Sequence, residues 1–120
     1  MMFQIWNTGG ARRLIFHPKA LEEIRDFPQP LRIACGELLR LLQEGVTLGM
    51  PASRPMPAVA TGIEELRIRG LPGQFRVFYL KKSRAGILIL RAFHKKTQET
   101  PHSEIVLVGR RLKELTDETE

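Results

Sequence analysis

Residues that could bind a phosphate gather in the second half of the chain. Arg67 and Arg76 lie in two consecutive segments joined by a short turn, so their side chains can share one face of a hairpin. The planar fork of a guanidinium suits a phosphate, whereas arginine does not exchange its proton at neutral pH. Lys95 and Lys96 follow the most apolar segment, and clustering with arginines would lower a lysine pKa toward the range useful for proton transfer. These residues are candidates for phosphate chemistry, with a lysine as base or acid.

Each of these residues also has a plain structural interpretation, which spacing alone does not exclude. Arginines on the polar side of an alternating strand are usually only solvated, and two lysines at a strand end can simply extend into water. His94 is the other candidate for proton transfer, because the unperturbed pKa of histidine is about 6.5. Tyr79 could stack on a base, but its alternation with Phe75 and Val77 fits a core position equally well.

Hydrophobic periodicity and turn residues predict the elements that position these side chains. Residues 12–16 predict a first strand, and residues 20–27 have the apolar spacing of a short helix. Prolines interrupt this helix, and an apolar stripe from Leu31 to Leu42 predicts a longer one that stops at Gly45. Two helices joined in this way form an antiparallel hairpin, which needs a sheet to cover its apolar face.

The following segments are predicted to supply that sheet. Residues 50–62 contain several prolines and are expected to form an extended connection without regular structure. Residues 64–69 and 75–80 alternate as half-buried strands do, with Arg76 opposite the apolar face of the second. Residues 87–93 are apolar enough for a central strand.

A polar segment and a last helix complete the predicted order. Residues 94–98 are expected to form a basic loop, and Pro101 to open a helix whose acidic end frays from Thr116. Its apolar face is formed by Ile105, Val108, Leu112 and Leu115, and the side chains expected to point elsewhere are Arg110, Arg111 and Lys113. The prediction is an α+β fold with an N-terminal strand, a helical hairpin, a three-stranded antiparallel meander and a C-terminal helix.

Length and charge limit the class of protein. A chain of 120 residues is long enough for one domain and too short for two cores, so we expect a single domain with residues 1–11 and 116–120 at its periphery. The 19 lysines and arginines exceed the 13 acidic residues, and the resulting formal charge of +6 favours RNA, DNA or an acidic protein segment as partner.

The cysteine content and the lack of long apolar runs indicate the compartment. Cys35 has no disulfide partner in the chain and falls in an apolar helical stripe, so we expect it in the core of a protein kept in a reducing cytoplasm. No apolar run reaches the roughly 18 residues that span a bilayer, and no spacing of histidine, cysteine or acidic residues suggests a metal site. We therefore expect neither a cofactor nor a membrane partner.

Three blocks of sequence resemble the RelE/HigB toxin superfamily, especially its phage-derived HigB-like branch. The blocks are Glu65-Leu66-Arg67, then Phe75-Arg76-Val77-Phe78-Tyr79, and then Ala92-Phe93-His94-Lys95-Lys96-Thr97-Gln98 followed by Thr100-Pro101 and Glu104-Ile105. They occur in the order of the family at compatible separations, and a looser match covers most of residues 12–115. The resemblance implies a RelE-like α+β fold.

The resemblance also implies a function. Toxins of this kind in type II toxin–antitoxin systems cleave mRNA in the ribosome without a metal, by attack of a ribose 2′-hydroxyl on the adjacent phosphate. This implies an mRNA endoribonuclease whose candidate catalytic residues are Arg67, Arg76, Lys95, Lys96, His94 and Tyr79. The candidate RNA contacts are Arg69, Arg91 and Thr97, of which Arg69 is not supported by the family blocks. The implied partners are the ribosome, mRNA and a HigA-like helix-turn-helix antitoxin, with operator DNA bound only through the antitoxin complex.

The chain departs from the family pattern at three positions, and two other functions stay open. Phe75 stands where a tyrosine is usual, Arg91 where a histidine is common, and His94 where valine or glutamine is frequent. One alternative is a ParE-like gyrase inhibitor of the same fold. The other is an RNA- or antitoxin-binding module with a decayed active surface. The clustering of Arg67, Arg76 and the lysine pair favours the nuclease, because gyrase inhibition needs no such cluster.

Overall fold

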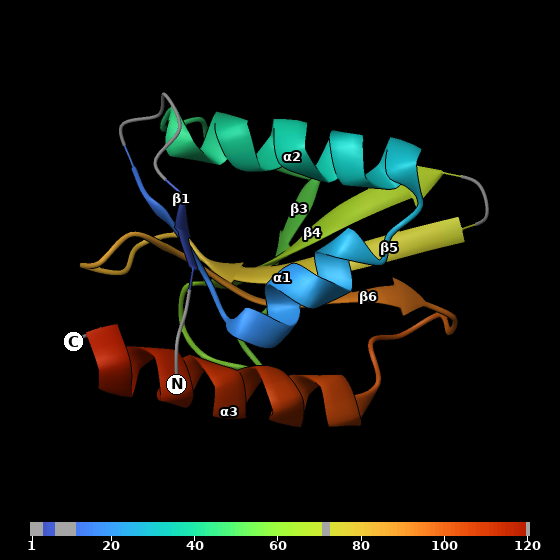
Figure 1. The fold of residues 1–120 in the computed structure, drawn as a ribbon. Helices are drawn as coiled ribbons and strands as arrows, with labels where there is room; N and C mark the ends of the chain where they lie inside the picture. The colour runs from blue at the N-terminus through green and yellow to red at the C-terminus, as the bar shows by residue number, and fades with distance from the viewer. Residues whose placement is uncertain (1–3, 7–11, 71–72, 120) are drawn as a thin grey trace.

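The computed structural model describes residues 4–6, 12–70 and 73–119, which form three helices around a six-stranded mixed sheet (Figure 1). The strands are β1 (Gln4–Trp6), β2 (Leu14–Phe16), β3 (Ser53–Pro55), β4 (Ile63–Gly70), β5 (Gly73–Leu80) and β6 (Ile87–Lys95). The helices are α1 (Pro18–Arg25), α2 (Gln29–Gln43) and α3 (His102–Thr119). None of the helices in the described ranges is long and apolar enough to cross a membrane.

The sheet has the strand order β1-β2-β6-β5-β4-β3. The antiparallel meander β4-β5-β6 is confirmed, and β6 lies in the interior of the sheet, as its apolar sequence predicts. β2 pairs in parallel with β6, since the chain crosses over through α1 and α2 before it returns to the sheet. The fold is therefore α+β, with a mixed sheet rather than a purely antiparallel one.

A glycine allows β6 to begin beside β2. Gly86 has a φ of 149°, and a Cβ at this position would lie 2.6 Å from the carbonyl oxygen of Arg13. The same carbonyl accepts a hydrogen bond from the backbone N–H of Ile87 at 2.8 Å. Only glycine permits both this backbone conformation and the close approach of the two chains.

The helices cover both faces of the sheet. α1 and α2 pack on one face, over a core that includes Phe16, Val77 and Tyr79. α3 packs on the other face, over a core that includes Phe78 and Leu88 (Figure 1). Strand alternation thus divides β5 as predicted, with Phe75, Val77 and Tyr79 on one side and Arg76 on the other.

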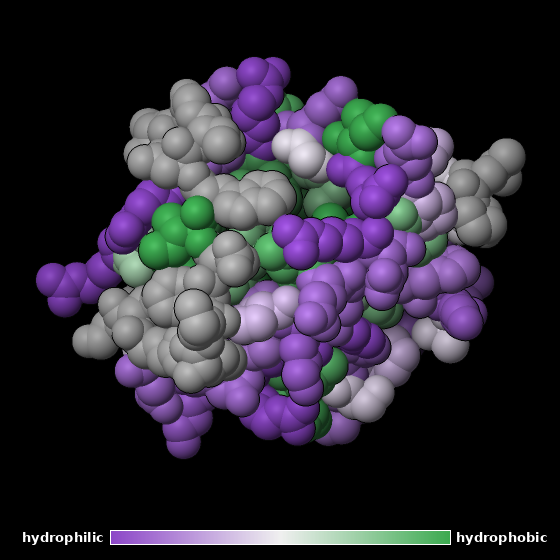
Figure 2. All heavy atoms as spheres, in the orientation of Figure 1, coloured by the Kyte–Doolittle hydropathy of each residue, from purple (hydrophilic) through white to green (hydrophobic). Residues whose placement is uncertain are grey.

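The large apolar side chains that are exposed among the described residues are scattered along the chain. Figure 2 shows a mostly hydrophilic face with small, separate hydrophobic areas. Ile33 on α2 and Val106 on α3 are exposed, but they belong to helices on opposite sides of the sheet. Cys35 is fully buried in α2, as predicted, and burial raises its pKa to about 12.

Two strands were not predicted. β1 lies in the segment expected to be peripheral and pairs antiparallel with β2, and β3 lies in the segment expected to lack regular structure and pairs with β4. Each has three residues, which is too short to show an alternating pattern, and a proline can end an edge strand such as β3.

Several predicted boundaries and exposures were also wrong. β6 extends through Lys95, so His94 and Lys95 belong to the strand rather than to the loop. α3 continues to Thr119 instead of fraying from Thr116. Arg111 is buried rather than exposed, because it forms an ion pair with Glu23 on α1.

That ion pair takes the place of a strand along the edge of β6. β2 ends at Phe16, and among the described residues no strand pairs with β6 on that side beyond this point. The backbone N–H of Ala92 donates instead to Glu23 Oε1 at 3.1 Å, and Arg111 Nη1 donates to the Leu90 carbonyl at 3.0 Å. Glu23 and Arg111 are joined at 2.8 Å. The pair satisfies backbone groups that would otherwise be buried without partners.

Candidate phosphate-binding site

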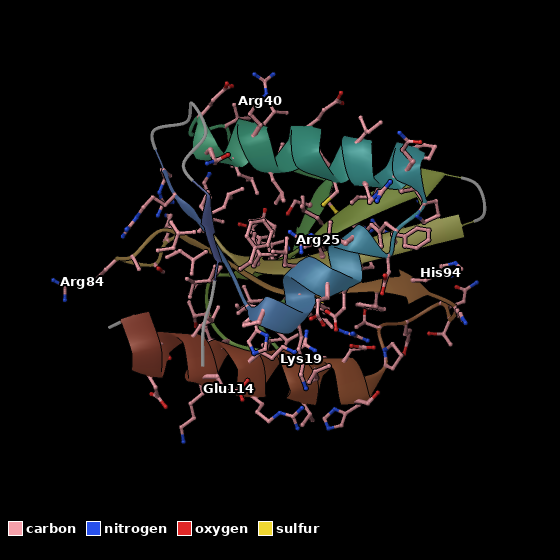
Figure 3. All side chains as sticks on the ribbon, viewed as in Figure 1. Lys19, Arg25, Arg40, Arg84, His94 and Glu114 are labelled. Carbon is pink, nitrogen blue, oxygen red and sulfur yellow. The ribbon has the colours of Figure 1, made fainter. Side chains whose placement is uncertain are left out.

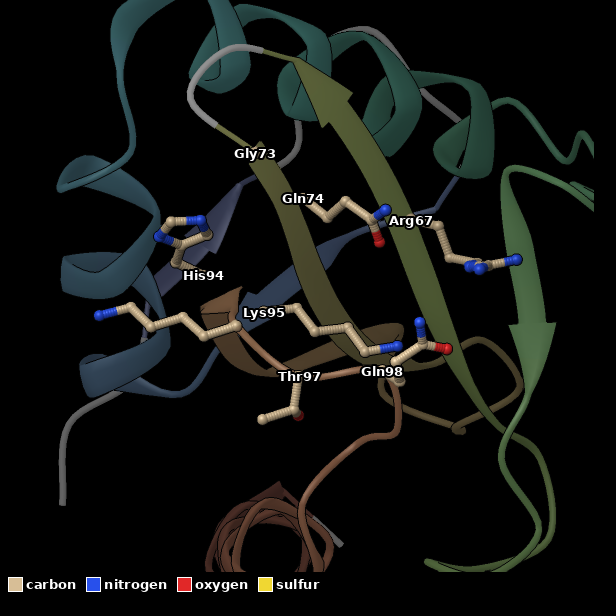
Figure 4. Close-up of a pocket in the computed structure, with 8 residues that line it drawn as sticks. Arg67, Gly73, Gln74, His94, Lys95, Thr97 and Gln98 are labelled. Atoms are coloured by element: carbon tan, nitrogen blue, oxygen red, sulfur yellow. The ribbon is translucent and has the colours of Figure 1, made fainter.

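A hollow of about 510 Å³ lies beside the β4–β5 hairpin and the last residues of β6 (Figure 4). We call it the cationic hollow, and its lining consists of Arg67, Gly73, Gln74, His94, Lys95, Lys96, Thr97 and Gln98. None of these described lining residues carries a carboxylate. Arg67, Lys95 and Lys96 bring positive charge to a lining without a carboxylate, which makes the hollow suitable for an anion.

Cross-strand register places the key side chains on one face of the sheet. Arg67 lies opposite Arg76 in the β4–β5 pair, and Gln74 lies opposite Lys95 in the β5–β6 pair. Directly opposed residues share a face. Because Gln74 and Arg76 are two residues apart in β5, all four side chains lie on the face that α3 covers further along. Arg67, Arg76 and Lys95 thus lie on one face of the sheet, although Arg76 does not line the hollow.

A β-bulge in β6 gives Lys95 this orientation. Tyr79 is opposite Ile89 and Phe78 is opposite Arg91, so Leu90 is an extra residue in β6. Ile89 faces α1 and α2, and uninterrupted alternation would turn Lys95 the same way. The extra residue reverses the alternation and turns Lys95 toward the cationic hollow.

Lys95 is the lining residue whose ionisation is most clearly perturbed. Burial lowers the pKa of Lys95, and the nearby charges of Arg76, Arg54 and Arg67 lower it further, against the opposing effect of Glu65. The direction agrees with the sequence-based prediction. Figure 4 shows Lys95 reaching from β6 toward Gln98 and Arg67. A lowered pKa increases the fraction of neutral amine available to accept a proton near neutral pH.

Arg76 lies beneath the hollow rather than in its wall. Its side chain has no exposed surface, and its Nη2 donates to Gln74 Oε1 at 2.7 Å. Burial lowers the pKa of Arg76, and the charge of Glu65 opposes that effect. In this position Arg76 supplies positive charge from below, and its predicted contact with a phosphate stays a prediction.

Glu65 is a part of the site to which the sequence assigned no role. Its carboxylate is fully buried, with Oε1 3.5 Å from Arg76 Nε and 3.9 Å from Arg54 Nη2. Oε2 accepts a hydrogen bond from Thr100 Oγ1 at 2.8 Å. Glu65 therefore ties the segment between β6 and α3, which carries Lys96, to the sheet. The alternation of residues 64–69 placed Glu65 on the polar side of its strand, which suggested a solvated carboxylate. The signal that could have indicated a role was its position in the block Glu65-Leu66-Arg67, which resembles the toxin family.

Arg54 was missed as well, because its strand was not predicted. It lies opposite Glu65 in the β3–β4 pair, so its side chain joins the same face. The Nε atoms of Arg54, Arg67 and Arg76 are buried without a hydrogen-bond partner, and so is Glu65 Oε1, which lies 3.5 Å from Arg76 Nε. The three arginines and the one carboxylate leave a net positive charge on this face of the sheet, which favours an anion.

The remaining candidates near the hollow are exposed. The imidazole of His94 stacks on Phe75, with ring centroids 4.5 Å apart and an interplanar angle of 14°. Thr97 Oγ1 donates to the Glu99 carbonyl at 2.6 Å. Arg69 projects from β4 two residues after Arg67 and lines an adjoining hollow. His94, Thr97 and Arg69 can therefore reach a ligand from the rim.

Tyr79 does not line the cationic hollow. It is fully buried on the face covered by α1 and α2, with its hydroxyl 2.8 Å from Ser53 Oγ and 3.4 Å from Glu64 Oε1. Burial raises its pKa to about 12. Of the two interpretations of Tyr79, the core position is the one that the structure shows.

Arg91 does not line the cationic hollow either. Its Nε lies 2.7 Å from Glu104 Oε1, and its Nη1 lies 2.5 Å from Glu23 Oε2. The hydrogen bond with Glu104 raises its pKa. Arg91 thus links α1 and α3 to β6, and both of its carboxylate partners would have to be displaced before it could bind RNA.

The described residues contain no group of three or more histidine, cysteine or acidic side chains that could hold a metal ion.

No curated protein matches the chain. The family model of phage-derived Gp49-like proteins matches residues 22–113, which include every cation of the cationic hollow. Because the match covers most of the sequence, the chain belongs to the Gp49-like family of phage-derived proteins.

Proposed function

We propose that the protein is a RelE/HigB-like toxin of a type II toxin–antitoxin system and that it cleaves mRNA on the ribosome as a metal-independent endoribonuclease. The cationic hollow carries the proposal, because Arg67, Lys95 and Lys96 line it without a carboxylate and the charge of Arg76 lies beneath it. Membership in the Gp49-like family, which is toxin-like, is consistent with this function.

The chemistry requires a base, an acid and stabilisation of a phosphorane. The ribose 2′-oxygen attacks the adjacent phosphorus while its proton passes to the neutral amine of Lys95. The bond from phosphorus to the 5′-oxygen then breaks, and Lys96 as an ammonium donates a proton to that oxygen. The products are a 2′,3′-cyclic phosphate and a 5′-hydroxyl. Arg67 stabilises the equatorial oxygens, and Arg76 adds positive potential from below.

The proposal extends to partners. A cognate antitoxin with a helix-turn-helix domain would neutralise the toxin, and operator DNA would be bound through that domain. The formal charge of +6 suits the acidic surfaces of an antitoxin as well as ribosomal RNA.

Mapping of mRNA 5′ ends after induced expression tests the proposal. We expect growth arrest and codon-phased cuts in translated messages, and we expect Lys95→Gln and Arg67→Gln to abolish both. Arg40→Gln is a matched control, because Arg40 lies on the outer surface of α2 (Figure 3) with its side chain 65% exposed. It should behave as the wild type.

The other outcomes identify the alternatives. DNA damage without cuts in mRNA would replace the proposal with gyrase inhibition. Normal growth with intact messages, despite a folded and expressed protein, would indicate a binding module without catalytic activity.

A further inference from the structure

A second, smaller hollow adjoins the cationic hollow and shares Arg67 with it. This hollow, which we call the Pro51 hollow, has a volume of about 270 Å³, and its lining consists of Pro51, Ala52, Arg67 and Arg69. We propose that it binds the nucleobase next to the phosphate held in the cationic hollow, and that it is therefore a base-recognition subsite. The inference rests on the proposed function and deepens it.

Pairing of the segment before β3 with β4 builds this hollow. The backbone N–H of Arg67 donates to the Ala52 carbonyl at 2.8 Å, which holds residues 51–52 beside β4. Arg67 and Arg69 are two residues apart in the same strand, so their side chains follow one another on one face. Figure 4 shows Arg67 extending from β4 toward β3, the green strand at the right, with Lys95 on its other side.

Arg67 therefore stands between two hollows of different chemistry. On one side Lys95, Lys96 and amide side chains offer charge and hydrogen bonds, and on the other side Pro51 and Ala52 offer an apolar surface. A single-stranded nucleotide has the same two parts, a charged backbone and a base with an apolar face. Its phosphate and base can thus contact the two sides of one guanidinium.

The lining of the Pro51 hollow favours a base over an apolar protein side chain. Two arginines line the hollow together with the apolar residues, and guanidinium planes can stack on nucleobases in single-stranded RNA. An aliphatic side chain placed there would remove water from Arg67 and Arg69 without replacing their hydrogen bonds. The volume lies below the roughly 300–1,000 Å³ of pockets for drug-sized ligands, which fits one ring system.

Binding of two matched oligonucleotides tests the inference. Both are single-stranded RNAs with the same number of phosphates and 2′-deoxy sugars at the reactive positions, and one of them lacks its central bases. We expect the wild type to bind the complete oligonucleotide at least fivefold more tightly than the abasic one, because stacking is worth about 1–3 kcal/mol per base.

Two variants of Arg69 separate stacking from charge. Arg69→Lys keeps the charge and removes the planar face, so it should weaken binding of the complete oligonucleotide about fivefold and leave the abasic one within twofold. Arg69→Gln also removes the charge and should weaken both. Arg69 is exposed, so the variants should keep the unfolding midpoint of the wild type, and Arg40→Lys provides the control for charge type on a distant surface.

The possible failures are distinguishable. Equal losses for both oligonucleotides in Arg69→Lys, or equal wild-type affinity for the two, would overturn the base subsite and leave the nuclease proposal intact. Failure of the wild type to bind either oligonucleotide, together with intact messages after induction, would overturn both.

Discussion

At the scale of single residues, the charged side chains of the site differ in role according to their burial and their partners. Lys95 is half-buried beside arginines that lower its pKa, whereas Arg76 and Glu65 are fully buried and hold one another. Arg91, only four residues before Lys95, is occupied by two carboxylates. Only Lys95 among these four lines the cationic hollow and has a lowered pKa.

The lowered pKa of Lys95 predicts the pH dependence of cleavage. The neutral amine accepts the proton, so the single-turnover rate on programmed ribosomes should rise with pH until Lys95 is fully deprotonated. Because the pKa is lowered, this rise should occur at lower pH than for an ordinary lysine, whose pKa is about 10.4. Lys95→Arg keeps the charge but should remove the rising limb and slow cleavage roughly 100-fold or more. An unchanged profile in Lys95→Arg would exclude Lys95 as the base.

The buried pair of Arg76 and Glu65 predicts a coupled effect on stability. Arg76→Met leaves the Glu65 carboxylate buried without its main partner, and the free energy of unfolding should fall by roughly 3–5 kcal/mol. Replacing Glu65 with leucine in the same chain should restore most of this loss. Urea unfolding of both single variants and the double variant measures the coupling, and strictly additive losses would show that the two side chains act independently.

At the scale of elements, β6 depends on groups from both helical layers. Its bulge turns Lys95 to the α3 face, and its free edge is completed by Glu23 from α1 and Arg111 from α3. The same strand, β6, therefore positions Lys95 and completes the hydrogen bonding at the edge of the core.

The edge of β6 predicts an acid-sensitive contribution to stability. Burial opposes ionisation of Glu23, but the hydrogen bonds from Arg111 and Ala92 outweigh this effect and lower its pKa. Because the pKa of Glu23 is lower in the folded state, its ionised carboxylate stabilises the fold fully at pH values above 4.5, the ordinary pKa of glutamate. This stabilisation is lost as the pH falls through the pKa of the folded state. Glu23→Gln should cost about 2 kcal/mol near neutral pH and flatten this acid limb in denaturant unfolding. It should also speed hydrogen exchange at Ala92. A protected Ala92 amide in the variant would show that the edge does not need the carboxylate.

The start of α1 predicts a second pH effect, closer to neutrality. His17 caps the helix, because its Nδ1 accepts from the Lys19 N–H at 3.2 Å while Nε2 lies 2.9 Å from Glu114 Oε1. Burial lowers its pKa, although Glu114 opposes the shift. As the pH falls, His17 is therefore protonated in the unfolded chain before it is protonated in the folded protein. The free energy of unfolding decreases between pH 6.5 and the pKa of His17 in the folded state. His17→Asn keeps a capping side chain and should remove this limb from the unfolding curve measured against pH. Persistence of the limb would assign it to another group.

At the scale of the whole molecule, the excess of cations predicts how RNA binding responds to salt. Each phosphate contact releases counterions from a single strand, so the slope of log K against log salt should fall by about 0.7 for each contact removed. Lys96→Gln should reduce the slope by this amount, because Lys96 is exposed in the cationic hollow. Arg40→Gln has the same change in net charge and should leave the slope unchanged. Equal slopes for the wild type and Lys96→Gln would show that Lys96 does not contact the backbone.

Much of the fold and part of the site were predictable from local pattern. Apolar spacing and prolines locate α1, α2, α3 and the meander, since the period of a helix or strand is carried by neighbouring residues. The same alternation places Arg76 opposite Phe75 and Val77, and the short β4–β5 turn brings Arg67 beside it. The cationic character of the site and the face of its arginines therefore follow from the order of residues along the chain.

Contacts between distant segments decided the rest. β1 and β3 are too short to have a pattern, and they become strands only because β2 and β4 offer unpaired edges. The extra residue at Leu90 is visible only against the register of β5, yet it determines that Lys95 faces the arginines. The burial of Glu65 depends on Thr100, 35 residues away in sequence, just as that of Arg111 depends on Glu23, 88 residues away. The hydrophobic periodicity of the sequence indicates on which face of its element a side chain lies. The charged or backbone group that it contacts on that face depends on how distant segments pack across the sheet.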